Sequence, residues 1–151
     1  MKQRICRFRG SGIFTRLVGV TLMALVVAAS LACSSNQIDK NRSEVLKQYE
    51  TLVRWSQWDA AAAFLAPEYL EQHPISRLEL DRLRLFRVTQ YTLRSARPDD
   101  GGMTLWQSVE IRLFNTNQAV ERTIMDEQQW RYDQASKSWR LYSGLPDPTK
   151  R

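Results

Sequence analysis

One alternating run of residues limits the fold of this chain more than any other feature. From residue 103 to residue 113, two sets of side chains alternate. One set is mostly apolar and contains Met103, Leu105, Gln107, Val109, Ile111 and Leu113. The other set contains the polar residues Thr104, Ser108, Glu110 and Arg112. A period of two places the two sets on opposite faces of a β-strand. The run therefore predicts a strand with one buried face.

Turn signals on both sides of this run predict further strands. Residues 98–102 read Pro-Asp-Asp-Gly-Gly, and residues 115–118 read Asn-Thr-Asn-Gln. Residues of these types favour tight turns because they tolerate the backbone angles that turns need. A third turn is expected over residues 133–138. The turns separate four expected strands, over residues 86–96, 103–113, 120–132 and 139–142.

The segment before the strands has the spacing of helices. Apolar residues recur every three or four positions between residues 45 and 53, which predicts an amphipathic helix that begins with Asn41 as its cap. A second helix is expected over residues 59–65, ended by Pro67, and a short turn over residues 67–72. Residues 75–84 fit neither a helical nor a strand period, so their structure stays open.

Helices followed by a strand meander predict an α+β domain, with N-terminal helices packed on a curved antiparallel four-stranded sheet. The segment from Trp58 to Pro67, together with the closing hairpin over residues 129–132 and 138–141, resembles the nuclear transport factor 2-like superfamily. The resemblance spans about residues 41–143 and implies a cone-like fold, often with an apolar pocket between sheet and helices. Some members of that superfamily are enzymes, and many bind ligands or partners.

The first 32 residues have the layout of an export signal. A basic stretch ends at Arg16, and 16 uncharged residues follow, from Leu17 to Ala32. A membrane-spanning helix needs about 20 apolar residues, so an uncleaved anchor is the less favoured alternative. The expected organisation is a signal peptide over 1–32, a lipidated terminus and flexible spacer over 33–40, the α+β domain over 41–145 and a tail over 146–151.

The five residues from Ala29 to Cys33 resemble the lipobox of bacterial lipoproteins. The resemblance implies cleavage before Cys33 and attachment of acyl chains to it, and two or more such chains anchor a protein stably to a membrane. Ser34, in place of an aspartate, implies the periplasmic face of the outer membrane, with the inner membrane as the alternative. Because Cys6 would be removed with the leader, no disulfide is expected.

Net charge argues against a nucleic-acid partner. Five of the 22 Lys and Arg residues lie in the first 32 positions with none of the 16 acids, so removal of the leader lowers the formal charge from +6 to +1. A nucleic-acid-binding domain needs its basic residues on the folded surface.

The sequence contains no recognised catalytic motif. His73 is the only histidine and lies beside Pro74, where we expect a partly solvated loop, and no metal or cofactor is expected. Asp126 and Glu127 are adjacent, so on a strand they point to opposite faces and cannot act together. A single inward acid, Asp126 or Glu127, would suit proton transfer in an enzyme of this fold.

Three tryptophans on the expected strands, Trp106, Trp130 and Trp139, are candidates for contact with a ligand or partner, as is Asp126. Trp106 shares its strand face with Thr104 and Ser108, so it would mark an outer contact patch. The first hypothesis is a non-catalytic binding or accessory module, anchored through Cys33, for a small apolar ligand or an envelope protein. The alternatives are a small enzyme using a pocket carboxylate and a structural subunit of an envelope complex.

Overall fold

The computed structural model describes residues 37–149 of the chain. Contacts divide the chain into two units, Met1–Lys40 and Asn41–Arg151, and only residues 37–40 of the first unit are described. The predictions that concern the leader and Cys33 therefore lie outside the described residues.

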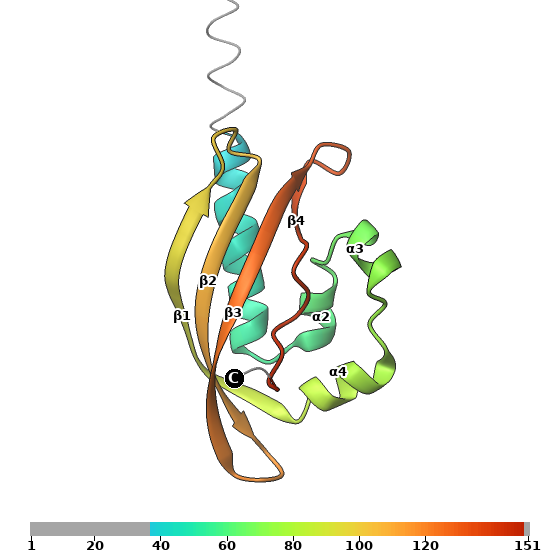
Figure 1. Cartoon of the computed structure of the whole chain (residues 1–151), viewed down its shortest axis with the longest axis vertical. Helices are drawn as coiled ribbons and strands as arrows, with labels where there is room; N and C mark the ends of the chain where they lie inside the picture. Colours follow the sequence, from blue (N-terminus) through green and yellow to red (C-terminus); the bar gives the residue numbers. More distant parts are fainter. Residues whose placement is uncertain (1–36, 150–151) are drawn as a thin grey trace, which may run out of the picture. The chain divides into compact units, whose positions relative to one another are not determined.

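The described elements follow the predicted order of helices and then strands (Figure 1). A long helix is described over residues 37–54 and is called the long helix below. The other elements are α2 (Trp58–Ala62), α3 (Pro67–Gln72), α4 (Arg77–Leu83), β1 (Phe86–Pro98), β2 (Thr104–Asn115), β3 (Val120–Asp133) and β4 (Ser138–Leu141).

The four strands form one antiparallel sheet in the order β1-β2-β3-β4. Two irregularities interrupt the β1–β2 register, between Val88 and Gln90 and between Leu93 and Ser95. Such bulges bend a strand and increase its twist, and Figure 1 shows β1 and β2 as curved strands. The α+β class, with helices followed by a four-stranded meander, is confirmed.

The start of the long helix differs from the prediction. Residues 37–40, expected in a flexible spacer, are helical, so the prediction that Asn41 caps the helix is wrong. The Oδ1 atom of Asn41 is buried without a hydrogen-bond partner among the described residues, which fits a position inside the helix. Ile38 stands seven residues before Val45, so the helical spacing of apolar residues continues into this part of the sequence.

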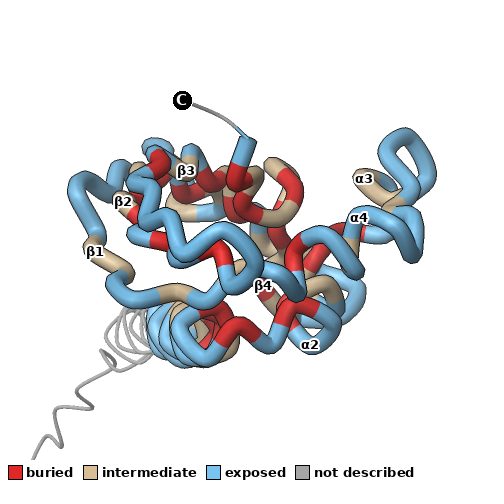
Figure 2. The backbone as a smooth tube through the Cα atoms, turned by 90° about the horizontal axis from the view of Figure 1, so that it is seen from below, coloured by how far each residue is buried: buried red, intermediate tan, exposed pale blue. Residues whose placement is uncertain are grey.

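The core lies between the long helix and one face of the sheet. Tyr49 of the helix and Trp130 of β3 are both fully buried, and their rings meet edge to face with centroids 5.0 Å apart. Phe64 contacts both rings, at 5.7 and 6.4 Å. Figure 2 shows buried segments of the strands facing those of the helices. Alternation along β2 is confirmed for Leu105, Gln107, Val109, Ile111 and Leu113, which are buried. Met103, expected on the same buried face, is exposed and precedes the strand.

The second helix is shorter than predicted, because residues after Ala62 leave it to pair with the sheet. The N–H of Leu141 donates to the carbonyl of Phe64 at 2.8 Å, and the N–H of Ala66 donates to the carbonyl of Leu141 at 2.9 Å. This parallel bridge covers the free edge of the short strand β4. Covered edges are protected from pairing with other chains.

Residues 75–84, whose structure the sequence pattern did not decide, contain the helix α4. Ser76 caps it by accepting from the N–H of Glu79 at 3.2 Å, while a Glu79 carboxylate oxygen accepts from the N–H of Ser76 at 2.7 Å. This reciprocal pair is a capping box. At the other end, Arg84 pairs with Asp59 and Asp81, each at 2.6 Å, and so links α4 to α2.

None of the helices described between residues 37 and 149 combines the length and the apolar character needed to cross a bilayer. Two prolines placed by sequence in the C-terminal tail, Pro146 and Pro148, are buried. The packed part of the chain therefore extends past residue 145.

Candidate functional site

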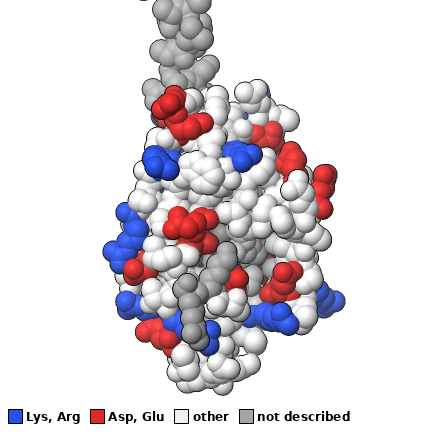
Figure 3. Space-filling view, in the orientation of Figure 1, with Lys and Arg blue, Asp and Glu red and all other residues white. Residues whose placement is uncertain are grey.

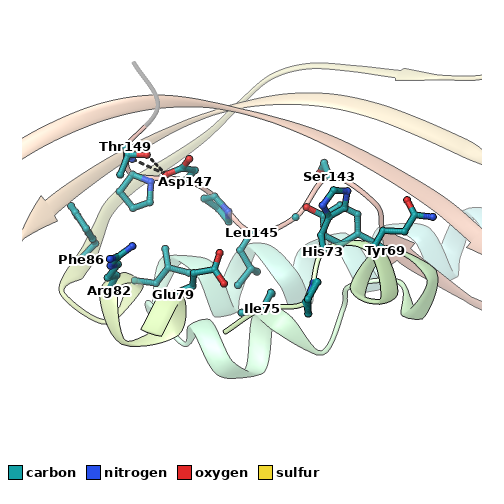
Figure 4. Close-up of a pocket in the computed structure, with 16 residues that line it drawn as sticks. Tyr69, His73, Ile75, Glu79, Arg82, Phe86, Ser143, Leu145, Asp147 and Thr149 are labelled. Atoms are coloured by element: carbon teal, nitrogen blue, oxygen red, sulfur yellow. Dashed lines mark hydrogen bonds between the residues drawn. The ribbon is translucent and has the colours of Figure 1, made fainter. Parts of the chain in front are cut away.

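A groove of about 650 Å³ runs between α3, α4 and the segment over residues 143–149, called the C-terminal segment below. Pockets that hold small ligands commonly enclose about 300–1,000 Å³. Figure 4 shows Ile75 and Leu145 in the middle of the groove, Arg82 and Phe86 toward one end, and His73 and Tyr69 toward the other. The lining contains both apolar and polar groups.

Two prolines and a cap shape one wall of the groove. Pro67 begins α3, because proline is tolerated in the first turn of a helix. Pro74 follows the end of α3, because proline is not tolerated inside a helix. Ser76 then starts α4. Tyr69 and His73 are four residues apart, and their rings are in contact, with centroids 4.8 Å apart and planes tilted by 39°. These local signals bring an aromatic pair to one end of the groove.

Gly144 allows the opposite wall to approach Tyr69 closely. Its backbone φ angle is +84°, which lies in the left-handed region that favours glycine. A Cβ atom at this position would lie 2.5 Å from the Tyr69 hydroxyl oxygen and 3.3 Å from its Cζ atom. The separation of the two walls therefore depends on the absence of a side chain at residue 144.

Both acids that line the groove already accept hydrogen bonds within their own segments. Glu79 accepts from the main chain and the side chain of Ser76, and these bonds hold the pKa of its carboxyl group below the usual value. Asp147 accepts from the N–H of Thr149 at 2.9 Å and from its hydroxyl at 2.6 Å. Both carboxylates keep their negative charge, and each already has hydrogen-bond donors within its own segment.

The guanidinium group of Arg82 is different. It lines the groove and forms no hydrogen bond or ion pair with any residue between 37 and 149. Its charge acts on Glu79 only through space. Elsewhere on the domain, acidic and basic side chains are interspersed, as the face drawn in Figure 3 shows. Arg82 is thus a cation available to an incoming group.

Asp126 and Glu127 face opposite sides of the sheet, as their adjacency predicted, and the structure shows that Asp126 is the one that faces the interior. Asp126 is partly buried and accepts from the side-chain amide of Gln128 at 2.6 Å. Glu127 is exposed and accepts from the hydroxyl of Ser108 at 2.6 Å. Gln128 also accepts from Gln107 at 2.5 Å and from the Trp130 indole at 3.1 Å. A connected polar cluster therefore lies inside the core.

Two tyrosine hydroxyls adjoin this cluster. Burial raises the pKa of Tyr49 well above its ordinary value, and the nearby Asp126 carboxylate raises it further. Burial likewise raises the pKa of Tyr91, against the opposing effect of a 3.4 Å hydrogen bond from Gln128. The Tyr49 hydroxyl has no hydrogen-bond partner among residues 37–149. Both phenols stay protonated at neutral pH, so they can donate hydrogen bonds.

The three candidate tryptophans lie in different surroundings. Trp130 and Trp139 are buried, with 0% and 1% exposure, and pack in the core, so a ligand contact for them stays a prediction. Trp106 is 47% exposed on the outer face of the sheet. Met125 is exposed on the same face, but the hydrogen-bonded pair Ser108 and Glu127 lies between them in the register. The two apolar side chains therefore do not form one continuous patch.

Metal ligands do not gather in the described part of the chain: no group of three or more His, Cys, Asp and Glu side chains is arranged to hold an ion. His73, the only histidine, is exposed, lines the groove and contacts the Tyr69 ring. Its predicted location in a loop is close to the observed one, directly after α3.

Sequence reasoning did not predict the groove or place Arg82 in it. The capping box formed by Ser76 and Glu79 is visible in the sequence as a serine and a glutamate three residues apart, and it would have predicted α4. No sequence signal indicates that the C-terminal segment returns to lie along α3 and α4. That contact joins residues about 70 positions apart, so only tertiary structure reveals it.

The chain matches no protein-family model, no curated protein and no solved structure at a significant level. Arguments about function therefore depend on the chemistry of the site.

Proposed function

We propose that this protein is a lipid-anchored envelope protein whose folded domain is a non-catalytic binding module. Acyl chains on Cys33 hold it at the periplasmic face of the outer membrane. The groove between α3, α4 and the C-terminal segment binds a small apolar ligand or a segment of an envelope protein. The resemblance of residues 29–33 to a lipobox supports the anchor, and the groove is the observation that carries the binding role.

Three properties of the groove favour binding over structural packing alone. Its volume is in the range of ligand sites. Ile75, Leu83 and Leu145 give it apolar surface, while Arg82 and His73 give it polar groups that can orient a ligand. Neither of its acids is uncommitted, so it lacks an available general base apart from His73.

Intact-mass analysis of protein from the membrane fraction tests the anchor. We expect a chain that begins at residue 33 and carries added acyl mass, and a Cys33→Ser variant that lacks the added mass and leaves the membrane fraction. Recovery of the mature chain with an unmodified thiol would refute lipidation. Fractionation of inner from outer membranes would decide between the two predicted addresses.

Dye binding tests the groove. Anilinonaphthalene sulfonate has an apolar body and an anionic group, so its fluorescence should rise on binding to this surface. Leu145 lines the groove, whereas Leu78 on α4 is 59% exposed outside it. We expect Leu145→Glu to weaken dye binding by about tenfold, because a charge enters an apolar contact, and Leu78→Glu to leave it unchanged. Equal effects of the two variants would place the dye elsewhere. Native mass spectrometry in mild detergent would detect compounds or partners that are retained.

A second function has one specific observation in its favour. Asp126 faces the interior with Gln128 as its polar partner and with the Tyr49 hydroxyl unpaired nearby, an arrangement suited to proton transfer. If the domain is an enzyme, a compound retained in native mass spectrometry should change mass on incubation. The isosteric Asp126→Asn variant should stop that change, and conversion at an unaltered rate would exclude Asp126 as the base.

A further inference from the structure

We propose that the groove binds an extended peptide segment of a partner protein and that an acidic side chain of this segment pairs with Arg82. This inference rests on the proposed role of the groove as the binding site and specifies the class of its occupant. It goes beyond that role because the charge and the backbone of the occupant are both fixed by features of the groove.

The groove is lined by one guanidinium group, that of Arg82, and by the two carboxylates of Glu79 and Asp147, which keep their negative charges. Glu79 and Asp147 are engaged by Ser76 and Thr149, whereas Arg82 has no polar partner among residues 37–149. A guanidinium group offers five donors in a planar fork that matches a carboxylate. An acidic group in the groove would therefore gain a partner without displacing an existing one.

The main chain of the C-terminal segment indicates a peptide. Among the described residues, no hydrogen bond uses the main-chain N–H or C=O of Gly144 or Leu145. Leu145 and Asp147 each precede a proline, which restricts them to extended backbone. Unpaired main-chain donors and acceptors of this kind can form hydrogen bonds with the main chain of a bound peptide.

The same features disfavour an acyl chain as the occupant. An acyl chain is best held in an enclosed apolar cavity, because it has no groups to pair with polar walls. In this groove, Gln72, His73 and Ser143 are polar residues of the lining. A peptide has amide groups for such polar partners and side chains for Ile75 and Leu145.

Three pools of seven-residue peptides with blocked ends test the inference. Their central residue is fixed as Glu, Gln or Lys, and the other positions are degenerate and uncharged. Each pool carries a zwitterionic fluorescent label. Binding of the pool to the mature protein in non-ionic detergent is measured by the fluorescence anisotropy of this label. We expect the Glu pool to bind about tenfold more tightly than the Gln pool, as a charge-assisted pair requires, and the Lys pool to bind most weakly.

Two variants on the same helix separate a specific contact from general charge. Arg82 lines the groove, whereas Arg77 is exposed on α4 and does not line it. Arg82→Gln should bring the Glu and Gln pools to equal affinity, and Arg77→Gln should leave the tenfold difference. The amides of Gly144 and Leu145 should exchange hydrogen more slowly when the Glu pool is bound. Equal effects of the two variants would overturn the inference.

Other outcomes distinguish this inference from the proposed function. If the three pools bind alike and Leu145→Glu abolishes their binding, the groove is a binding site but the acidic peptide is wrong. If no pool binds while dye binding still depends on Leu145, the conclusion is the same. If vesicles of phosphatidylglycerol bind in an Arg82-dependent manner and compete with the Glu pool, the occupant is a lipid. If no pool binds and the dye is insensitive to Leu145→Glu, both proposals fail.

Discussion

Replacement of Gly144 by alanine gives a direct test of how the groove is built. The added Cβ atom would lie 2.5 Å from the Tyr69 hydroxyl oxygen, closer than such atoms can approach, and the φ angle of +84° is unfavourable for any residue with a side chain. Left-handed backbone costs an L-residue about 1–2 kcal/mol. Moving the Tyr69 ring off His73 adds to this cost, so we expect Gly144→Ala to lower the free energy of unfolding by about 2–3 kcal/mol.

Gly102 provides the matched control. Its φ angle is +67°, but no atom lies within 4 Å of the position that a Cβ would occupy. Gly102→Ala should therefore show the backbone cost alone, about 1–2 kcal/mol. Urea unfolding followed by circular dichroism measures both variants under the same conditions. The excess cost in Gly144→Ala is the part that comes from the collision with Tyr69.

A double-mutant cycle checks the origin of that excess. Tyr69→Phe removes the hydroxyl oxygen that the new Cβ would meet, so Gly144→Ala should cost less in this background, by about 0.5–1 kcal/mol. Dye binding should fall in Gly144→Ala and not in Gly102→Ala, because only the first change displaces a groove wall. Equal costs for the two alanine variants, with no coupling to Tyr69, would refute the reasoning.

Three further predictions concern capping, burial and pH. Ser76→Ala should destabilise the domain by about 1 kcal/mol through loss of the cap of α4, with Ser76→Thr near wild type in the same urea assay. Tyr49→Phe should leave stability unchanged or raise it, because the buried hydroxyl that it removes has no partner in the described residues; a clear loss in calorimetry would reveal a hidden partner. Hydrogen bonds lower the pKa of Asp99 and Asp133, so these carboxyl groups bind protons less readily when folded. Their contribution is present above the usual aspartate pKa and is lost as pH falls through the lowered values, and a urea midpoint unchanged between about pH 6 and pH 3 would contradict this.

Much of the fold could be predicted because its elements follow from local patterns. The alternation around Val109 and the turn at residues 98–102 placed two strands, and Pro67 placed α3 correctly. The errors arose where local and distant preferences compete. Leu65 has helical propensity, yet pairing with Leu141 draws it out of α2. Local sequence contains no information about that pairing.

The candidate site likewise has some features that the sequence predicted and others that it did not. The adjacency of Asp126 and Glu127 correctly predicted that they face opposite sides of the sheet, because strand geometry fixes this whatever the fold. The position of Asp126 in a cluster with Tyr49 and Gln128 could not be predicted, because the cluster joins side chains from separate elements. The same holds for the groove, which joins α3 and α4 to a segment near the end of the chain.

The sequence by itself determined the order of helices and strands, the inward face of β2 and the fact that Asp126 and Glu127 point to opposite faces, because these depend on backbone periods and turn chemistry within about ten residues. Only tertiary structure decided that Trp130 is covered by Tyr49, that Gly144 meets Tyr69 and that Arg82 lies without an anionic partner in the described chain. Such contacts depend on how apolar faces from distant segments pack together to exclude water. No local pattern encodes the partner that each face will find.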